Sequence, residues 1–219
     1  MKKVKNNQKI YLENPQRGVL EEIGNAITHG IGALLSILGL VLLLLKCGKT
    51  IEYISSIIYC SGLIILFTMS CLYHSFKNQT TVKNIFRRFD HLSIYILIVS
   101  TFIPILLVFI GGFNGGIFGV CQWIVAILGI VFISVFGVNK FKKLHMILYL
   151  LLGWSGIMLL PFMIKKELNL AYFILGGGII YTLGIIPFKI KGKCAHFIWH
   201  FFVLLGALIH WIGIYLYAI

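Results

Sequence analysis

The 219-residue chain is 59% hydrophobic and only 11% charged, with a mean hydropathy of +0.98. Soluble domains carry roughly 25% charged residues, so the composition excludes a soluble globular protein and predicts an integral membrane protein. The formal net charge of +13 would suit a nucleic-acid binder. Because the basic residues sort by loop, as shown below, we expect membrane lipids and not nucleic acid as partners.

Seven apolar segments are long enough to cross a bilayer as helices. They lie at about 26–45, 53–73, 92–110, 117–138, 144–164, 169–188 and 195–218. These segments leave no room for a separate soluble domain. The sequence therefore predicts an all-α membrane protein with one seven-helix bundle over residues 19–219, preceded by a flexible, basic cytoplasmic tail at 1–18.

Two connections between these segments are distinctive. Residues 74–91 form the longest and most basic predicted loop. The glycine-rich run at 111–116 is expected to form an outward turn, since glycine runs break helices.

The basic residues indicate how the bundle sits in the membrane. With a cytoplasmic N-terminus, fifteen of the 19 lysines and arginines fall in inward segments. The other four, in outward loops, are Lys46, Lys49, Lys165 and Lys166. An excess of basic residues in cytoplasmic loops is the usual signature of orientation, so the N-terminus is predicted inside and the C-terminus outside.

Three histidines fall at segment ends on the predicted cytoplasmic face. His196 and His200 are four residues apart, so on a helix they share one face, about 6 Å apart along the axis. His74 would add a third imidazole from another helix. Three imidazoles suit zinc and leave a fourth position open, as in catalytic zinc sites. The alternative is that each histidine is an interfacial residue with its ring among the lipid headgroups.

Two more polar residues lie near the same face. Asp90, the only aspartate in the chain, precedes His91 at the start of the third segment. Ser70 precedes His74 by four positions and shares its helix face. The Ser70 hydroxyl either bonds to a carbonyl of the preceding turn or lies near the metal.

The remaining histidines are not expected to bind the metal. His91 and His145 are expected at the interface. His210 lies ten residues beyond His200, about 15 Å deeper along a helix, so it cannot join the same metal. We expect it to be buried and hydrogen-bonded within the bundle.

Three separated motifs occur in order along the chain. They read Glu22-x-x-Asn25-x-x-Thr28-His29, then Ser70-x-x-x-His74 followed by Asp90-His91, then His196-x-x-x-His200 followed by His210. With its seven spans, the chain resembles the hemolysin III family of the progestin and adipoQ receptor superfamily, which is also similar to alkaline ceramidases. The resemblance covers about residues 18–219, and the short N-terminal tail resembles bacterial members.

The resemblance implies functions for the motif residues. It implies zinc bound by His74, His196 and His200. It implies that Asp90 holds or deprotonates a water at the zinc, with Ser70 nearby as a polar or oxyanion contact. Residues expected to be structural or to support the ligands are Glu22, Asn25 and His29.

Three functions remain open from the sequence. The first is zinc-dependent hydrolysis of an amide or ester in a membrane lipid, serving lipid homeostasis in the plasma membrane. The second is a non-catalytic sensor or regulator of membrane state with a structural zinc. The third is cytolysis, which the lack of a secretion signal disfavours for a secreted toxin. The short, glycine-rich outward loops offer little surface to a protein ligand, so none is expected.

Overall fold

The computed structural model describes residues 17–190 and 192–219. Residues 1–16 of the predicted tail lie outside the described residues. Within the described ranges the chain forms helices and no strand, in the order α2 (Val19–Lys46), α3 (Thr50–Ser75), α4 (Thr81–Pro104), η1 (Ile105–Ile110), α5 (Gly112–Phe136), α6 (Lys142–Trp154), η2 (Ser155–Leu159), α7 (Leu160–Lys166), α8 (Leu168–Lys189) and α9 (Ala195–Tyr217).

These helices make seven apolar spans of 22 to 30 residues in the described part of the chain. In the third span η1 continues α4, and in the fifth α6, η2 and α7 follow one another without a break. Each span is long enough to cross the hydrocarbon layer. The prediction of an all-α, seven-span membrane protein is confirmed.

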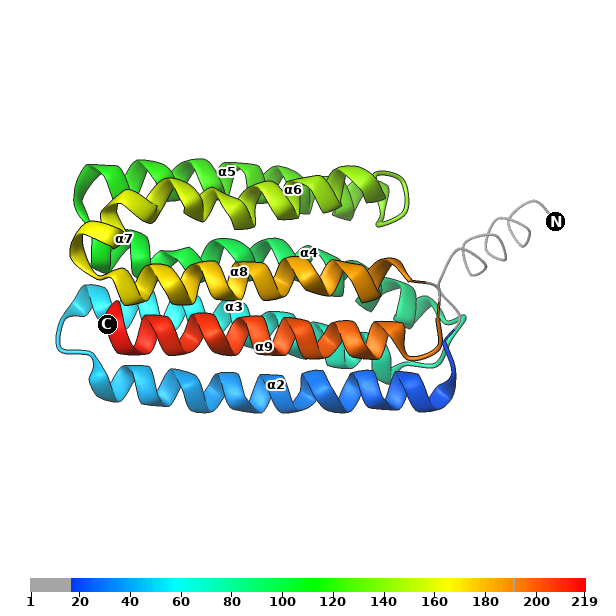
Figure 1. Ribbon diagram of the computed structural model, residues 1–219. Helices are drawn as coiled ribbons and strands as arrows, with labels where there is room; N and C mark the ends of the chain where they lie inside the picture. The colour runs from blue at the N-terminus through cyan, green and yellow to red at the C-terminus, as the bar shows by residue number, and fades with distance from the viewer. Residues whose placement is uncertain (1–16, 191) are drawn as a thin grey trace.

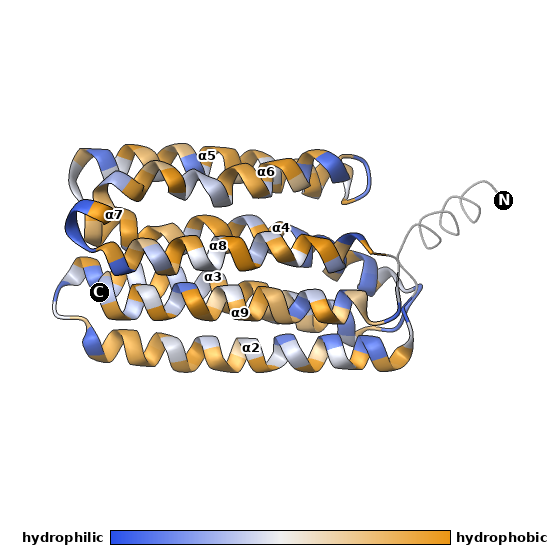
Figure 2. Ribbon diagram, viewed as in Figure 1, coloured by the Kyte–Doolittle hydropathy of each residue, from blue (hydrophilic) through white to orange (hydrophobic). Residues whose placement is uncertain are grey.

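The helices lie roughly along one direction in stacked layers (Figure 1). Helix α3 packs between α2 and α4, α9 packs against α8 and α2, and α5 and α6 cover the far side of α4. The start of α2 and the end of α9 lie at opposite ends of the bundle (Figure 1). Hydrophobic residues cover the length of the helices, and hydrophilic residues gather mainly near the ends (Figure 2).

Both distinctive connections are shorter than predicted. Helix α3 continues to Ser75 and α4 begins at Thr81, so Asp90 lies inside a helix and does not open one. The predicted turn at 111–116 is reduced to Gly111, whose φ of 69° only glycine adopts readily, and α5 begins at Gly112. A membrane has no water to pair with exposed backbone groups, so polar and glycine-rich sequences near span ends still form helix.

Two of the spans lose regular α geometry over part of their length. Directly after Pro104 the third span continues as the six-residue π-helix η1. The fifth span changes to a 3₁₀ turn, η2, directly after Trp154. Irregular backbone at membrane depth is tolerated where it is buried or lines a cavity. Trp154, Gly156 and Ile157 do line a cavity, which is described below.

Candidate metal centre

Three imidazoles converge at the end of the bundle where α2 and α9 begin and α3 ends. His74 lies in the last turn of α3, and His196 and His200 lie in the first two turns of α9. The Nε2 atom of His196 is 3.3 Å from that of His74 and 3.2 Å from that of His200. One nitrogen from each of the three residues lies within 4.8 Å of the other two.

The two separations measured from His196 match those of a tetrahedral metal. Zinc bonds histidine nitrogen at about 2.0–2.1 Å, so two ligand nitrogens of a tetrahedron are about 3.3–3.4 Å apart. In the described chain no carboxylate or thiolate joins the three histidines. The site thus offers three nitrogen ligands and leaves a fourth position to water or a substrate.

A hydrogen bond at Nδ1 of His74 leaves the lone pair on its Nε2 atom, which faces the other two histidines. The Nδ1 atom of His74 is 2.5 Å from Oε2 of Glu22, and the Asn25 amide is 3.4 Å from the same nitrogen. A carboxylate only accepts, so Nδ1 carries the proton and the Nε2 lone pair is free. Such a carboxylate partner is the usual means of orienting a metal-binding histidine.

The hydrogen bond to His200 has the same effect. Thr28 Oγ1 donates to the carbonyls of Gly24 and Asn25, so its oxygen can accept from Nδ1 of His200, 3.3 Å away. The Nε2 lone pairs of His74 and His200 therefore both face His196. Converging lone pairs repel one another unless a cation lies between them, so the donor set fits a metal ion.

A buried lysine completes the support of His74. Lys83 Nζ is 3.1 Å from Oε1 of Glu22 and donates to the carbonyl of Phe76 at 3.0 Å. Its side chain is 2% exposed and its ammonium lies 4.9 Å from the centre of the Tyr73 ring. From the sequence, Lys83 is interpreted only as a basic residue of a cytoplasmic loop. The direction of its side chain depends on where α4 begins, and that position could not be predicted.

We expect Lys83→Met to weaken zinc binding about 10- to 100-fold, the usual effect of losing an outer partner of a ligand. Glu22 would then be a buried carboxylate without its cation, and it would hold His74 less well. The affinity can be measured on detergent-purified protein by competition with a chromophoric chelator. Lys77→Met is the matched control, because Lys77 is an exposed lysine at the same end. Equal affinities for the two variants would contradict this support role.

Asp90 and Ser70 lie beside the histidines. Asp90 is buried, its Oδ2 is 3.4 Å from Nδ1 of His91, and its charge acts on His74. Ser70 Oγ lies next to the Asp90 carboxylate and is buried without a regular hydrogen bond among the described residues. The alternative that Ser70 bonds to a carbonyl of the preceding turn is therefore wrong.

The other histidines differ in their surroundings. His29 stacks on His200, with ring centres 3.6 Å apart and planes at 15°, so it supports that ligand by packing. His145 is buried and hydrogen-bonded to the Tyr95 hydroxyl at 2.8 Å, so its predicted interfacial place is wrong. His210 is buried and bonded to the Ile174 carbonyl at 3.0 Å, as predicted.

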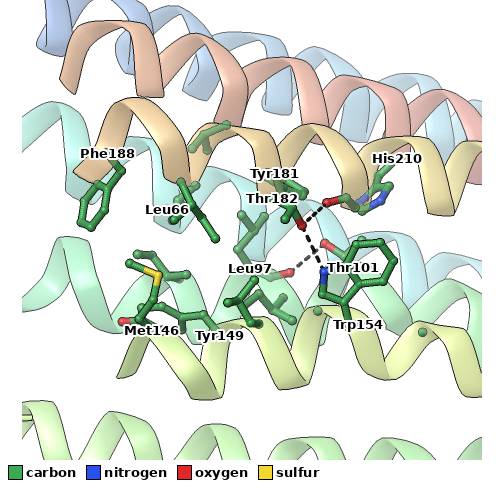
Figure 3. Close-up of a pocket in the computed structure, with 18 of the residues that line it drawn as sticks. Leu66, Leu97, Thr101, Met146, Tyr149, Trp154, Tyr181, Thr182, Phe188 and His210 are labelled. Atoms are coloured by element: carbon green, nitrogen blue, oxygen red, sulfur yellow. Dashed lines mark hydrogen bonds between the residues drawn. The ribbon is translucent and has the colours of Figure 1, made fainter. Parts of the chain in front are cut away.

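A cavity of about 190 Å³ leads away from the histidines into the bundle. Asp90 and His196 line it near the metal centre, and Thr101 and His210 line it at the other end. Most of its other lining is apolar and comes from α4, α6, α8 and α9, as Figure 3 shows for Leu97 and the residues around it. The cavity thus joins a polar, metal-competent end to an apolar interior.

The sequence profile of a family described as "Haemolysin-III related" matches residues 18–211, which include every residue of the metal centre. The chain belongs to this family. It is 37% identical over 194 residues to Hemolysin-3 of Bacillus cereus, covering 86% of this chain and 88% of the relative. It is 38% identical over 195 residues to the Hemolysin-3 homolog of Bacillus subtilis, covering 86% and 90%.

The similarity extends to animal proteins of the same length class. The chain is 30% identical over 205 residues to the human monocyte to macrophage differentiation factor, covering 90% of this chain and 84% of the relative. The haemolysin-III family therefore accounts for nearly the whole chain, as the three motifs suggested, and the protein is an integral membrane protein.

Proposed function

We propose that this haemolysin-III protein is a zinc-dependent hydrolase that cleaves an amide or ester bond of a membrane lipid. The observation that carries the proposal is the convergence of the Nε2 atoms of His74, His196 and His200 at the mouth of an apolar cavity that also contains Asp90. Three ligands with an open fourth position are typical of catalytic zinc, whereas structural zinc usually has four protein ligands.

The residues around the metal centre suit hydrolysis. Bound zinc supplies a Lewis acid that activates water and polarises a carbonyl. Asp90 takes a proton from the water as its oxygen bonds to the carbonyl carbon of the lipid. Asp90 then returns the proton to the leaving nitrogen or oxygen as the carbon–nitrogen or carbon–oxygen bond breaks. The products are a carboxylic acid and an amine or alcohol. The Ser70 hydroxyl lies near enough to the Asp90 carboxylate to assist it in this proton transfer.

The place of the centre in the bundle supports a lipid substrate. It lies at one end of the spans, the level at which lipids carry their amide and ester linkages. The basic residues near α3, α4 and α9 support a cytoplasmic location for this end, where anionic headgroups would attract them. We therefore place the reaction at the cytoplasmic face of the plasma membrane, where it would serve membrane-lipid homeostasis.

A single assay tests the proposal. The full chain is purified in detergent, stripped of metal, and incubated with amide-linked and ester-linked lipids with and without added zinc. Released fatty acid is measured by mass spectrometry, and release that depends on zinc is the expected result. Zinc binding without release from any lipid would instead favour a sensor or regulator with a structural metal.

The name of the Bacillus cereus relative, Hemolysin-3, favours cytolysis as a second candidate function. The purified protein added to red blood cells tests it through release of haemoglobin. Lysis by the wild type and also by a variant without the three histidines would support cytolysis separate from hydrolysis. No lysis at concentrations that hydrolyse lipid would remove this candidate.

A further inference from the structure

Helices α6 and α8 form two facing walls of the cavity. Figure 3 shows Met146 and Trp154 of α6 opposite Phe188 and Thr182 of α8. Phe188 marks the end near the metal centre, because its ring centre lies 6.3 Å from that of His196. Met146 lies across from Phe188 at this same end (Figure 3).

Each wall has a glycine in the middle of the helix face that lines the cavity. The lining positions of each helix recur at spacings of three, four or seven residues, so they share one face. They include Met146, Leu150 and Gly153 on α6, and Ile174, Gly178 and Ile185 on α8. A side chain at Gly153 or Gly178 would therefore point into the cavity.

The space in front of these two glycines is open. A Cβ atom at Gly153 or at Gly178 would have no neighbour within 4 Å among the described residues. Gly177 is different, because a Cβ atom there would lie only 2.2 Å from the His210 ring. Close helix packing is the usual reason for glycine in a membrane helix, and glycine otherwise weakens a helix relative to alanine. Packing accounts for Gly177 but not for Gly153 and Gly178.

The depth of the two glycines matches the length of a lipid chain. Gly153 follows Met146 by seven residues, about 10 Å along α6, and Gly178 precedes Phe188 by ten residues, about 15 Å along α8. The hydrocarbon core of a bilayer is about 30 Å thick, so the chains of one leaflet span about 15 Å. Ile174 lines the cavity one turn beyond Gly178, so a chain of this length can pass both glycines.

A hydrogen bond holds the two walls together beside the glycines. Trp154 Nε1 donates to Thr182 Oγ1 at 3.0 Å, which joins α6 to α8. The Thr182 hydroxyl in turn donates to the carbonyl of Gly178 at 2.8 Å. The separation of the walls is therefore fixed near the level of Gly153 and Gly178, and a side chain added there cannot be accommodated simply by moving one wall.

We propose that Gly153 and Gly178 determine the length of the acyl chain that the cavity accepts. Both glycines leave the cavity open, so chains as long as one leaflet are accepted. A larger side chain at either position occupies the cavity and stops the chain at that depth. The direction of the chain, with its linkage at the metal, rests on the proposed function.

Binding of fatty acids to Gly178→Leu tests this without any turnover. The full chain in detergent is loaded with a fluorescent fatty acid, which is displaced by octanoic, lauric or stearic acid. Comparing variant and wild type for the same acid cancels the partition of that acid into detergent. Each buried methylene strengthens binding about fourfold, so we expect stearic acid to bind the variant about 10- to 100-fold more weakly and octanoic acid to bind it unchanged.

The result that would overturn the proposal is equally direct. If Gly178→Leu weakens stearic acid no more than octanoic acid, or if none of the acids displaces the probe from the wild type, Gly178 does not select chain length. Gly178→Ala is the milder variant, which favours the helix, and it should weaken stearic acid by a few-fold only.

Gly153→Leu and Gly116→Leu locate the effect. Gly153 lies less deep than Gly178, so Gly153→Leu should weaken lauric acid as well as stearic acid. Gly116 also has open space around it, but it lies on α5 and is not among the residues that line the cavity. Gly116→Leu should therefore bind all three acids like the wild type, and a loss equal to that of Gly178→Leu would contradict the proposal.

Hydrolysis measured on the same proteins separates this proposal from the proposed function. A change of chain length in binding, without hydrolysis by the wild type, would support the two glycines and contradict the hydrolase. Hydrolysis with the same dependence on chain length in the wild type and in Gly178→Leu would support the hydrolase and contradict the role of the glycines.

Discussion

His196→Ala protein is expected to contain no zinc after purification, and wild-type protein is expected to contain about one zinc per chain. His196 is the shared neighbour in the cluster, with its Nε2 within 3.3 Å of the Nε2 atoms of both His74 and His200. Without it, two imidazoles on different helices remain, and two ligands do not hold zinc through purification. The metal content is measured by mass spectrometry of the detergent-purified protein.

The control for this experiment is a buried histidine at the same end of the bundle, His145. His145 is hydrogen-bonded to Tyr95 at 2.8 Å and is not one of the three clustered ligands. His145→Gln should therefore retain the zinc of the wild type. Equal zinc content in the His196→Ala and His145→Gln proteins would remove the three histidines as the metal site.

The sequence predicted the spans and the histidine cluster because both depend on short-range patterns. Apolar runs of more than 20 residues specify membrane helices directly. The pair His196 and His200 specifies a shared face through the helix period alone. The basic residues then placed the end of the segment containing His74 on the same side, so a third ligand could be inferred without knowing how the helices pack.

The partners of the ligands could not be predicted in the same way. Lys83 of α4 pairs with Glu22, and Thr28 of α2 contacts the ligand His200. Both contacts depend on the rotation of each helix about its axis. Charge counting treats a lysine near a span end as exposed to the cytoplasm. Because α4 begins earlier than hydropathy suggests, Lys83 is instead buried against Glu22, and the loop expected at 74–91 is mostly helix.

Asp90 decides between a catalytic and a structural metal. It lines the cavity beside His196 but does not belong to the group of atoms close enough to share one ion. We therefore expect this carboxylate to hold a water next to the metal and not to bind the metal itself. The first coordination shell then has three protein ligands, which is the arrangement of a site with an exchangeable position.

Asp90→Asn is expected to keep the zinc of the wild type and to lose lipid hydrolysis by about 10²- to 10⁴-fold, the range typical of a removed general acid–base. Asparagine keeps the size of the side chain and its place beside Ser70, but its amide cannot accept a proton from water at neutral pH. The expected result is read from zinc content and fatty-acid release measured on the same preparation.

Ser93→Ala is the matched control for this variant. Ser93 is buried one turn after Asp90, and its hydroxyl donates to the Asp90 backbone carbonyl at 2.7 Å, away from the carboxylate. Removing the Ser93 hydroxyl tests whether any small change to this part of α4 stops the reaction, and turnover within a few-fold of the wild type is expected.

Unchanged hydrolysis by Asp90→Asn would remove Asp90 from the mechanism. Loss of zinc from Asp90→Asn, with Ser93→Ala still loaded, would make Asp90 a fourth ligand and favour a structural metal, because the open position that hydrolysis needs would be filled.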